Sequence, residues 1–382
     1  MIDKLIFTVT PIFSIPPRGA AAVETWIYQV AKRTRIPNRI ACIREDGFSE
    51  KDIVNERCSI HRIGFSRLYK RIFQKWSRID PIPYSQRVLN IAKDFNITND
   101  SIIIVHNSMK LYRQIREKAP DAKMIMHMHN AFTPKGLDSN VKMLVPSQYL
   151  KDFYEKHLPD AEICIVPNGT ELHNLDKELP PLTKQDLGIP SEKKVIFYAG
   201  RISPEKGTVL LLQAFKKLIK SCDNIELVVV GDYNNKDKGE KAAYQKQVRE
   251  LAGTIGSRCH LVGGVKPDDM YRYYPIADLV VIPSQFQEPF CMVAIEAMGA
   301  GRPVLVSTRG GMVEFVKNNH TGFHINEPML PESLASDIYE TLHSEKLEQI
   351  ANNGKKYVLE NYLWWQVTHK FENVLGKVRT SS

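Results

Sequence analysis

Long hydrophobic runs are absent from this sequence of 382 residues. No apolar stretch approaches the ~18 consecutive residues of a membrane-spanning helix, so the sequence predicts none. Cysteine is scarce, and its six residues are scattered without a C-x-x-C motif or a cluster with histidine. This spacing argues against a disulfide scaffold and favours free thiols in a reducing cytoplasm. With 43% hydrophobic and 25% charged residues the chain is typical of a globular protein of two or three domains.

Acidic residues are too few to balance the basic ones. The 52 Lys and Arg exceed the 43 Asp and Glu, which gives a net charge of +9. Residues 1–180 hold +7 of this excess, whereas residues 181–382 are nearly balanced. A basic protein attracts anionic partners such as nucleic acid, anionic lipid or a phosphorylated substrate. The uneven distribution predicts that the two halves bind different partners.

Positive charge is densest at residues 57–79, which contain seven Lys or Arg and no acid. Within this segment apolar and aromatic residues recur at helical spacing from Phe65 to Trp76. Such a helix either packs on a sheet or lies on an anionic membrane, and the sequence supports both alternatives equally. In the second alternative the partner is the anionic inner-membrane surface or a phosphorylated glycolipid. The contact residues are then Arg67, Lys70, Arg71, Lys75 and Trp76.

Short apolar runs alternate with longer amphipathic stretches along the whole chain. Many are continuous, which is typical of parallel strands that are buried on both faces. The alternation predicts βαβ units and an α/β fold. The predicted strands are residues 5–10, 40–43, 60–64, 101–106, 123–129, 143–146 and 163–167 in the first half, and residues 195–200, 225–231, 260–263, 279–284, 303–307 and 322–325 in the second.

A polar stretch with three prolines, residues 170–192, indicates a linker between the halves. We therefore expect two doubly wound, Rossmann-like domains that face a central cleft. Their expected bounds are residues 1–175 and 190–355. Ligands bind at the carboxyl ends of the strands in such domains.

Residues 198–207 connect a predicted strand to a helix and carry two cations. Gly200 allows a tight turn, and Arg201 and Lys206 follow the end of the strand. Two cations beside a helix N-terminus suit a diphosphate. Taken alone, the segment is explained slightly better by two solvated surface charges.

Residues 283–298 hold two glutamates eight positions apart. Pro289 is expected in the first helical turn after a strand, with Glu288 just before it. Glu288 can accept hydrogen bonds from sugar hydroxyls, and Glu296, two turns along the helix, can accept them from a ribose. Free backbone amides for phosphate oxygens are expected at Phe290, Cys291, Met292 and Val293.

A glycine pair, Gly310–Gly311, follows a later predicted strand and lets the backbone approach a ligand closely. With G-R-I-x-x-x-K-G at residues 200–207, E-x7-E at 288–296 and G-x-P-V at 301–304, this G-G-x-x-E segment completes four motifs. Together they resemble the retaining family-4 glycosyltransferases of the GT-B fold. More loosely, the resemblance extends over the first half of the chain.

The resemblance implies a nucleotide-sugar donor, retention of the anomeric configuration and no metal requirement. It implies that Arg201 and Lys206 neutralise the diphosphate, that Glu288 holds the transferred sugar and that Glu296 holds the ribose. The family commonly has glycine where this chain has Cys291. The second domain then binds the nucleotide sugar, and the first faces the acceptor and the membrane. Residues 356–382 are expected to form a helix that packs back on the first domain.

The turn after the first strand is also expected to meet the donor. The family usually has two glycines there, and this chain has Gly19 alone, beside Arg18. Small residues still allow a close backbone approach, although ordinary turn chemistry explains the segment about as well. Arg18 is expected on the acceptor side.

Histidines end two predicted strands of the first half. His127 and His129 alternate onto one face, and Asn130 extends the loop that follows them. A lone histidine is more often packed or solvated than functional, but the resemblance makes His129 the active-site histidine, which contacts and positions the donor sugar. We expect His127 and Asn130 on the acceptor side, together with His106 and Asn107 from a neighbouring strand.

Residues 6–26 and 106–116 resemble the branch of the family that builds the enterobacterial lipopolysaccharide core. That resemblance implies UDP-N-acetylglucosamine as donor, an outer-core glucose as acceptor and an α-1,2 linkage, for a cytoplasmic enzyme bound peripherally to the inner membrane. The residues themselves reach only a nucleotide sugar, so UDP-glucose and UDP-galactose remain alternatives. A nucleic-acid-binding protein ranks low, because no binding module is visible and the two glutamates would be unexplained.

Overall fold

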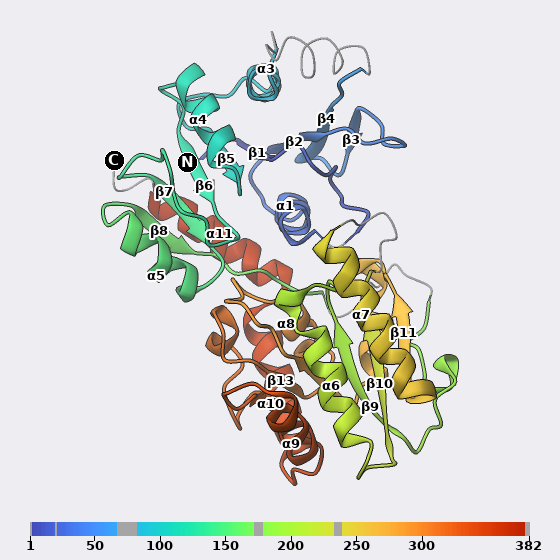
Figure 1. Ribbon diagram of the computed structural model, residues 1–382. Helices are drawn as coiled ribbons and strands as arrows, with labels where there is room; N and C mark the ends of the chain where they lie inside the picture. Colours follow the sequence, from blue (N-terminus) through green and yellow to red (C-terminus); the bar gives the residue numbers. More distant parts are fainter. Residues whose placement is uncertain (1, 20, 67–81, 172–178, 233–238, 379–382) are drawn as a thin grey trace. The chain divides into compact units, whose positions relative to one another are not determined.

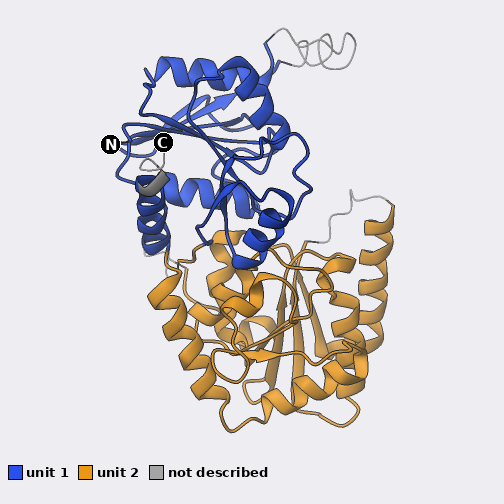
Figure 2. Cartoon of the chain, turned by 90° about the vertical axis from the view of Figure 1, so that its left-hand side faces the viewer, with its two compact units in different colours: residues 1–168, 364–382 blue, residues 169–363 orange. Residues whose placement is uncertain are grey.

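The structure is a computed structural model that describes residues 2–19, 21–66, 82–171, 179–232 and 239–378 (Figure 1). The chain forms two compact units, which Figure 2 colours separately. The first unit comprises residues 1–168 and 364–382, and the second comprises residues 169–363. The first stretch of the first unit thus ends at residue 168 instead of the expected 175. The second unit continues to residue 363 instead of the expected 355.

The first unit is built on an eight-stranded sheet with the order β3-β4-β2-β1-β5-β6-β7-β8. All neighbouring strands are parallel except β3 and β4. The strands are β1 (Leu5–Val9), β2 (Asn38–Ile43), β3 (Lys51–Ile53), β4 (Cys58–Ile63), β5 (Ile102–His106), β6 (Met124–His127), β7 (Lys142–Val145) and β8 (Glu162–Ile165). Every residue of β1 and β5 is buried, as expected for central parallel strands.

The described helices of the first unit are α1 (Ala22–Ala31), α3 (Tyr84–Asp94), α4 (Met109–Lys118), α5 (Gln148–His157) and α11 (Trp364–Val378). Ser108 caps α4 and Ser147 caps α5, because each hydroxyl accepts a hydrogen bond from the backbone three residues later. The last helix, α11, packs on α1: the rings of Phe371 and Trp26 lie 5.5 Å apart. The sequence predicted one helix over residues 356–382, but α10 ends at Asn361 and α11 begins at Trp364.

The second unit has a six-stranded parallel sheet with the order β11-β10-β9-β12-β13-β14. The strands are β9 (Lys194–Ala199), β10 (Ile225–Val230), β11 (Cys259–Gly263), β12 (Leu279–Ile282), β13 (Val304–Val306) and β14 (Phe323–His324). The α-helices are α6 (Thr208–Leu218), α7 (Glu240–Ile255), α8 (Met292–Gly299), α9 (Pro331–Leu342) and α10 (Leu347–Asn361). Short 3-10 turns include η3 (Pro204–Lys206), η5 (Pro267–Arg272) and η6 (Tyr274–Ile276).

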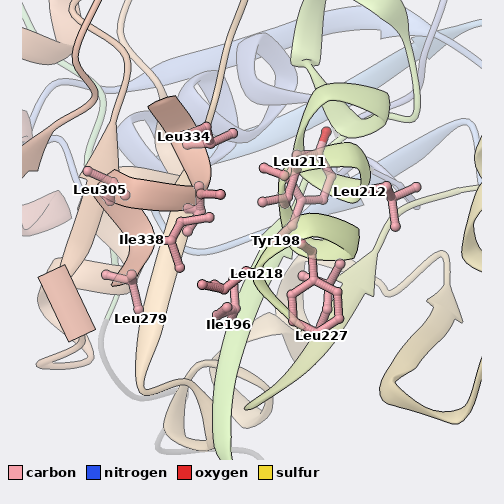
Figure 3. Close-up of a cluster of buried hydrophobic side chains, with 14 of the residues drawn as sticks. Ile196, Tyr198, Leu211, Leu212, Leu218, Leu227, Leu279, Leu305, Leu334 and Ile338 are labelled. Carbon is pink, nitrogen blue, oxygen red and sulfur yellow. The ribbon is translucent and has the colours of Figure 1, made fainter. Parts of the chain in front are cut away.

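Apolar cores cover both faces of the second sheet. On one face, side chains of α6 and α9 converge on strand residues such as Ile196 and Leu279 (Figure 3). On the other face, Ala294, Ile295 and Met298 of α8 pack on strand residues of opposite parity. Burial on both faces explains why the strands are continuous apolar runs in the sequence. No helix in the described part of the chain is long and apolar enough to cross a membrane.

Candidate active site

The first cluster of predicted residues lies where two loops leave the second sheet. β9 and β12 are neighbours, but β10 continues on the far side of β9 and β13 on the far side of β12. In doubly wound sheets, ligands bind outside the carboxyl ends of the strands at such a switch point. The loop after β9 carries Lys206 and the loop after β12 carries Glu288. The backbone N–H of Gln285 donates to the Glu205 carbonyl oxygen at 2.8 Å, which joins the two loops.

Close contact between these loops depends on Gly207. Its φ is +72°, and a Cβ there would overlap the carbonyl oxygen of Pro283. Any other residue would push the loop that carries Lys206 away from the loop that carries Glu288.

Glu288 and Lys206 form the central ion pair of this cluster. Lys206 Nζ lies 2.6 Å from Glu288 Oε1, and the Ser284 hydroxyl donates to the same oxygen at 2.5 Å. The Glu288 side chain is 4% exposed and that of Lys206 is 19% exposed, so water screens the pair weakly. Because one carboxylate oxygen takes both bonds, Glu288 Oε2 is the oxygen that can accept from a ligand hydroxyl.

The main chain of Glu288 is held by the glycine pair. The carbonyl oxygen of Glu288 accepts a 2.7 Å hydrogen bond from Gly311 N, and Glu288 forms a β-bridge with Gly310. A Cβ on Gly310 would overlap the Glu288 backbone. The two glycines were predicted to give a ligand access to the backbone. In the structure the backbone that they approach is that of Glu288.

The helix after Glu288 begins later than the sequence predicted. Helix α8 starts at Met292, not near Pro289, because Cys291 has a φ of +81° and stands outside the helix as its N-cap. Glu288 and Glu296 therefore do not share one helix, and the helical spacing assumed between them is wrong. Burial raises the pKa of the Cys291 thiol to about 12, so this side chain stays protonated at neutral pH.

The Phe290 side chain packs in the core, which leaves only its backbone to face a ligand. Its side chain is 4% exposed, and its ring lies 5.1 Å from that of Phe315 and 5.7 Å from that of Tyr362. Met292 and Val293 occupy the first turn of α8, where backbone amides lack partners within a helix.

The second glutamate, Glu296, is on α8 and faces Tyr274 of η6. The Tyr274 hydroxyl donates to Glu296 Oε2 at 2.6 Å. Burial raises the pKa of Glu296, and the hydrogen bond from Tyr274 opposes that rise. Glu296 retains partial exposure whereas Tyr274 is 2% exposed, so the tyrosine holds the carboxylate from the buried side.

Arg201 is the exposed cation of the cluster. Its side chain is 64% exposed and lies 3.5 Å from Glu205 in an ion pair. An exposed pair of this kind contributes little to stability, so Arg201 can turn to an incoming anion at small cost.

The second cluster lies at the carboxyl end of the first sheet. Strands β1, β5 and β6 are neighbours, and their register places Val9 beside His106 and His106 beside His127. The strand order reverses between β1 and β5, as it does between β9 and β12 in the other unit. His129 follows β6 by two residues.

Three imidazoles meet there. Nitrogen atoms of His106, His127 and His129 all lie within 4.8 Å of one another. His106 Nδ1 is 3.2 Å from His129 Nε2, and the rings of His127 and His129 are 4.0 Å apart. The Trp26 ring covers the cluster, with its centre 4.4 Å from that of His127.

The cluster is neutral at physiological pH. Burial lowers the pKa of His129 to about 3 and the pKa values of His106 and His127 well below 6.5. His106 and His127 are 0% exposed and His129 is 6% exposed. Four ring nitrogens have no hydrogen-bond partner within the described chain: Nε2 of His106, both nitrogens of His127 and Nδ1 of His129. With neither residue exposed, His106 and His127 contact His129 rather than a surface on the acceptor side.

Asn107 and Asn130 fix the loop around His129. The Asn107 side chain accepts from His129 N at 3.2 Å, and Asn107 itself has a φ of +54°. The Tyr154 hydroxyl donates to the carbonyl oxygen of Asn130 at 2.7 Å. In this structure both asparagines therefore accept hydrogen bonds from other residues of the first unit.

Arg18 and Gly19 lie in the loop after β1. The Arg18 guanidinium donates to the Asp46 carbonyl oxygen at 2.9 Å and lies 4.2 Å above the Phe48 ring. A Cβ on Gly19 would meet open space. No close contact within the unit therefore requires glycine at this position. The residues predicted at the membrane, Arg67, Lys70, Arg71, Lys75 and Trp76, lie outside the described residues.

Comparison with known proteins shows the family of the chain. Residues 181–357 match the family model described as glycosyl transferases group 1. The sequence is 55% identical, over 97% of this chain and 98% of the relative, to the lipopolysaccharide 1,2-N-acetylglucosaminetransferase of Salmonella typhimurium. The chain belongs to the group 1 glycosyltransferases. It is therefore an enzyme that transfers a glycosyl group.

Solved structures agree on the fold of this glycosyltransferase. Sucrose-phosphate synthase from Thermosynechococcus elongatus matches with a TM-score of 0.80 and 18% identity, over 99% of this chain and all of that chain. Anabaena HepE in complex with UDP and glucose matches with a TM-score of 0.73 and 19% identity, over 97% and 99% of the two chains. The predicted GT-B fold of two Rossmann-like domains is confirmed.

Several residues around the glycosyltransferase's predicted sites carried no sequence signal. In the sequence Ser284 is visible only as the last residue of a predicted strand, although a polar residue at that point is placed to meet Glu288. Glu205 lies between the two predicted cations and was not assigned. Tyr274 is far from either glutamate in the sequence and could be found only from the fold.

Proposed function

We propose that this glycosyltransferase moves N-acetylglucosamine from UDP-N-acetylglucosamine to a glucose of the lipopolysaccharide outer core, in α-1,2 linkage and with retention of configuration. The observation that carries the proposal is the 55% identity over nearly the whole length of the Salmonella enzyme of that name. HepE, a neighbour in fold, is known with UDP-glucose bound, which supports a UDP-linked donor.

The donor diphosphate is assigned to Arg201 and Lys206. Arg201 is exposed and free to turn, and Lys206 is held beside Glu288 at 2.6 Å. Two cations and the first-turn amides of α8 and α6 supply the positive potential that a diphosphate needs. We propose that they take the place of a metal ion and that transfer requires none.

Glu288 is assigned to the transferred sugar and Glu296 to the ribose. Lys206 and Ser284 fix one oxygen of Glu288, which directs the other toward sugar hydroxyls. A fixed carboxylate orients a sugar without the entropy cost of ordering a free side chain. Phe290, Cys291, Met292 and Val293 contribute backbone at the start of α8, and Gly310–Gly311 hold Glu288 in place.

His129 is proposed to contact the donor sugar as a neutral imidazole. Its Nε2 is engaged with His106, whereas its Nδ1 has no partner in the described chain. Nδ1 is therefore the ring nitrogen left for a sugar hydroxyl, although it is buried in the structure as it stands. A pKa of about 3 makes His129 unsuited to take up a proton at neutral pH, so a positioning role fits better than a general base.

The first half is proposed to bind the membrane glycolipid at the cytoplasmic face of the inner membrane. The support is sequence charge: seven Lys or Arg and no acid in residues 57–79. Charge reversal of Arg67, Lys70, Arg71 and Lys75 should reduce co-sedimentation with vesicles of anionic lipid while turnover on a soluble acceptor fragment persists. Undiminished sedimentation would leave that segment with a purely structural role.

A donor screen tests the proposed reaction. Purified enzyme is incubated with lipopolysaccharide truncated before this sugar and with UDP-N-acetylglucosamine, UDP-glucose or UDP-galactose. Only the first should give a product, and NMR of that product should report an α-1,2 linkage. If only glucose or only galactose is transferred, the proposed donor is wrong. If the product is a β-anomer, the proposed retention of configuration is wrong.

A further inference from the structure

Tyr274 connects the buried core of the second unit to Glu296. Its hydroxyl donates to Glu296 Oε2 at 2.6 Å, and its ring is 2% exposed. Among the described residues this is the sole side-chain partner found for the Glu296 carboxylate. When a hydrogen bond from the buried side holds one oxygen of a carboxylate, the other oxygen points in a fixed direction.

The segment that carries Tyr274 is itself held firmly. The Tyr274 ring packs at 5.8 Å on Phe197 of β9, the strand that leads to the loop of Arg201. Arg302, which follows α8, donates to the carbonyl oxygens of Pro275 at 3.4 Å and Ala277 at 3.3 Å. Tyr274 is thus fixed to the strand before the diphosphate loop and close to the helix of Glu296.

We propose that Tyr274 is a positioning residue that determines how the enzyme recognises the ribose of its donor. By fixing Oε2, it aims Oε1 of Glu296 at the vicinal ribose hydroxyls, which donate hydrogen bonds to it. This inference rests on the proposed role of Glu296. It predicts that removal of the Tyr274 hydroxyl weakens ligands with ribose hydroxyls and spares ligands that lack them.

Calorimetric titration with UDP and with 2′,3′-dideoxy-UDP tests this inference. Tyr274→Phe keeps the ring and removes only the donor. It should weaken UDP about tenfold, the loss expected for one hydrogen bond to a charged group. It should change the affinity for the dideoxy ligand by less than about twofold. In turnover, KM for UDP-N-acetylglucosamine should rise by a similar factor while kcat is retained.

Two further variants complete the experiment. Tyr84→Phe is the matched control, since Tyr84 is also a buried tyrosine, with its hydroxyl donating to the Ala41 carbonyl oxygen in the other unit. It should leave both affinities unchanged. In a Glu296→Gln background, Tyr274→Phe should have little further effect, because the two residues act as one unit. Circular dichroism establishes that each variant is folded.

The outcomes distinguish a failure of the role of Tyr274 from a failure of the role of Glu296. Equal weakening of UDP and dideoxy-UDP by Tyr274→Phe, or no weakening of UDP, overturns the role of Tyr274. If Glu296→Gln retains the full preference for UDP over dideoxy-UDP, the assignment of Glu296 to the ribose fails instead. If the wild-type enzyme does not bind UDP, the proposed donor fails.

Discussion

The two units gather ionisable side chains at equivalent places in their sheets but treat charge in opposite ways. In the second unit, Glu288 is paired with Lys206 at 2.6 Å and supported by Ser284. In the first unit, three buried histidines leave four ring nitrogens without partners in the described chain. A buried charge persists only with an opposite charge and hydrogen bonds beside it, whereas a buried imidazole can lose its proton. The site in the second unit therefore keeps its charges, whereas the site in the first unit stays neutral.

Loss of Glu288 from the charged site should have the largest effect on turnover. Glu288→Ala removes the proposed contact to the transferred sugar and the partner of Lys206, so kcat should fall by about 100- to 1000-fold. The measurement is initial-rate transfer from UDP-N-acetylglucosamine, with circular dichroism to show that the variant is folded. Glu360→Gln is the control, because it breaks the exposed Lys356–Glu360 pair. Near-normal turnover of a folded Glu288→Ala enzyme would remove Glu288 from the site.

Acid should break the neutral cluster and destabilise the first unit. Each of the three histidines has a folded pKa below its unfolded value of about 6.5, so the unfolded chain binds more protons as the pH falls. Their stabilisation is complete above pH ~6.5 and is lost below it. Together they should lower the free energy of unfolding by a few kcal/mol between pH 7.5 and 5.5. His61, whose pKa is about 4, acts in the same direction.

Urea unfolding followed by tryptophan fluorescence measures this effect, since all four tryptophans belong to the first unit. His127→Phe should reduce the pH-dependent loss by about one third, and His343→Gln in the second unit should leave it unchanged. An identical pH dependence for His127→Phe and the wild type would contradict the neutral cluster.

Backbone strain distinguishes the two sites by a smaller difference in stability. Each site contains one residue other than glycine at positive φ, Asn107 in the first unit and Cys291 in the second. Asparagine adopts this conformation at little cost, whereas for cysteine it costs about 1–2 kcal/mol. Cys291→Gly should therefore be more stable than Cys291→Ala by about 1 kcal/mol, measured by calorimetry. Gly253→Ala in α7, where a Cβ meets open space, should show the opposite order. If alanine is the more stable residue at 291, strain there is negligible.

Chelation should have the smallest effect. If Arg201 and Lys206 replace a metal at the diphosphate, dialysis against EDTA should leave turnover unchanged. Three histidine nitrogens within 4.8 Å are nevertheless the described group best suited to a divalent ion such as zinc. A loss of activity that zinc restores, with one equivalent of zinc measured per chain, would contradict metal-independent transfer. Abolition of that binding by His127→Phe would then assign the ion to the histidine cluster.

Most of the fold was predictable because buried parallel strands leave a plain signal. All thirteen predicted strands correspond to strands of the structure. The missing strand is β3, residues Lys51–Ile53, which is short, antiparallel and at the sheet edge, with exposed residues at both ends. Its sequence has no continuous apolar run because one side of it faces solvent. The start of α8 was misplaced for a different reason: proline at 289 suggested a helix start, whereas the Glu288–Gly310 bridge keeps that segment extended.

The amino-acid sequence is enough to predict the family, the two-unit α/β architecture and the chemically active residue types at each strand end. Motif spacing carries this information because loops after parallel strands converge at one edge of a sheet. How those residues pair depends on the tertiary structure. Lys206 and Glu288 are far apart in the chain, as are Tyr274 and Glu296, and only the packing of loops and helices brings each pair within 2.6 Å. Burial, which makes the histidines neutral and leaves the Lys206–Glu288 pair weakly screened, likewise exists only once the chain has folded.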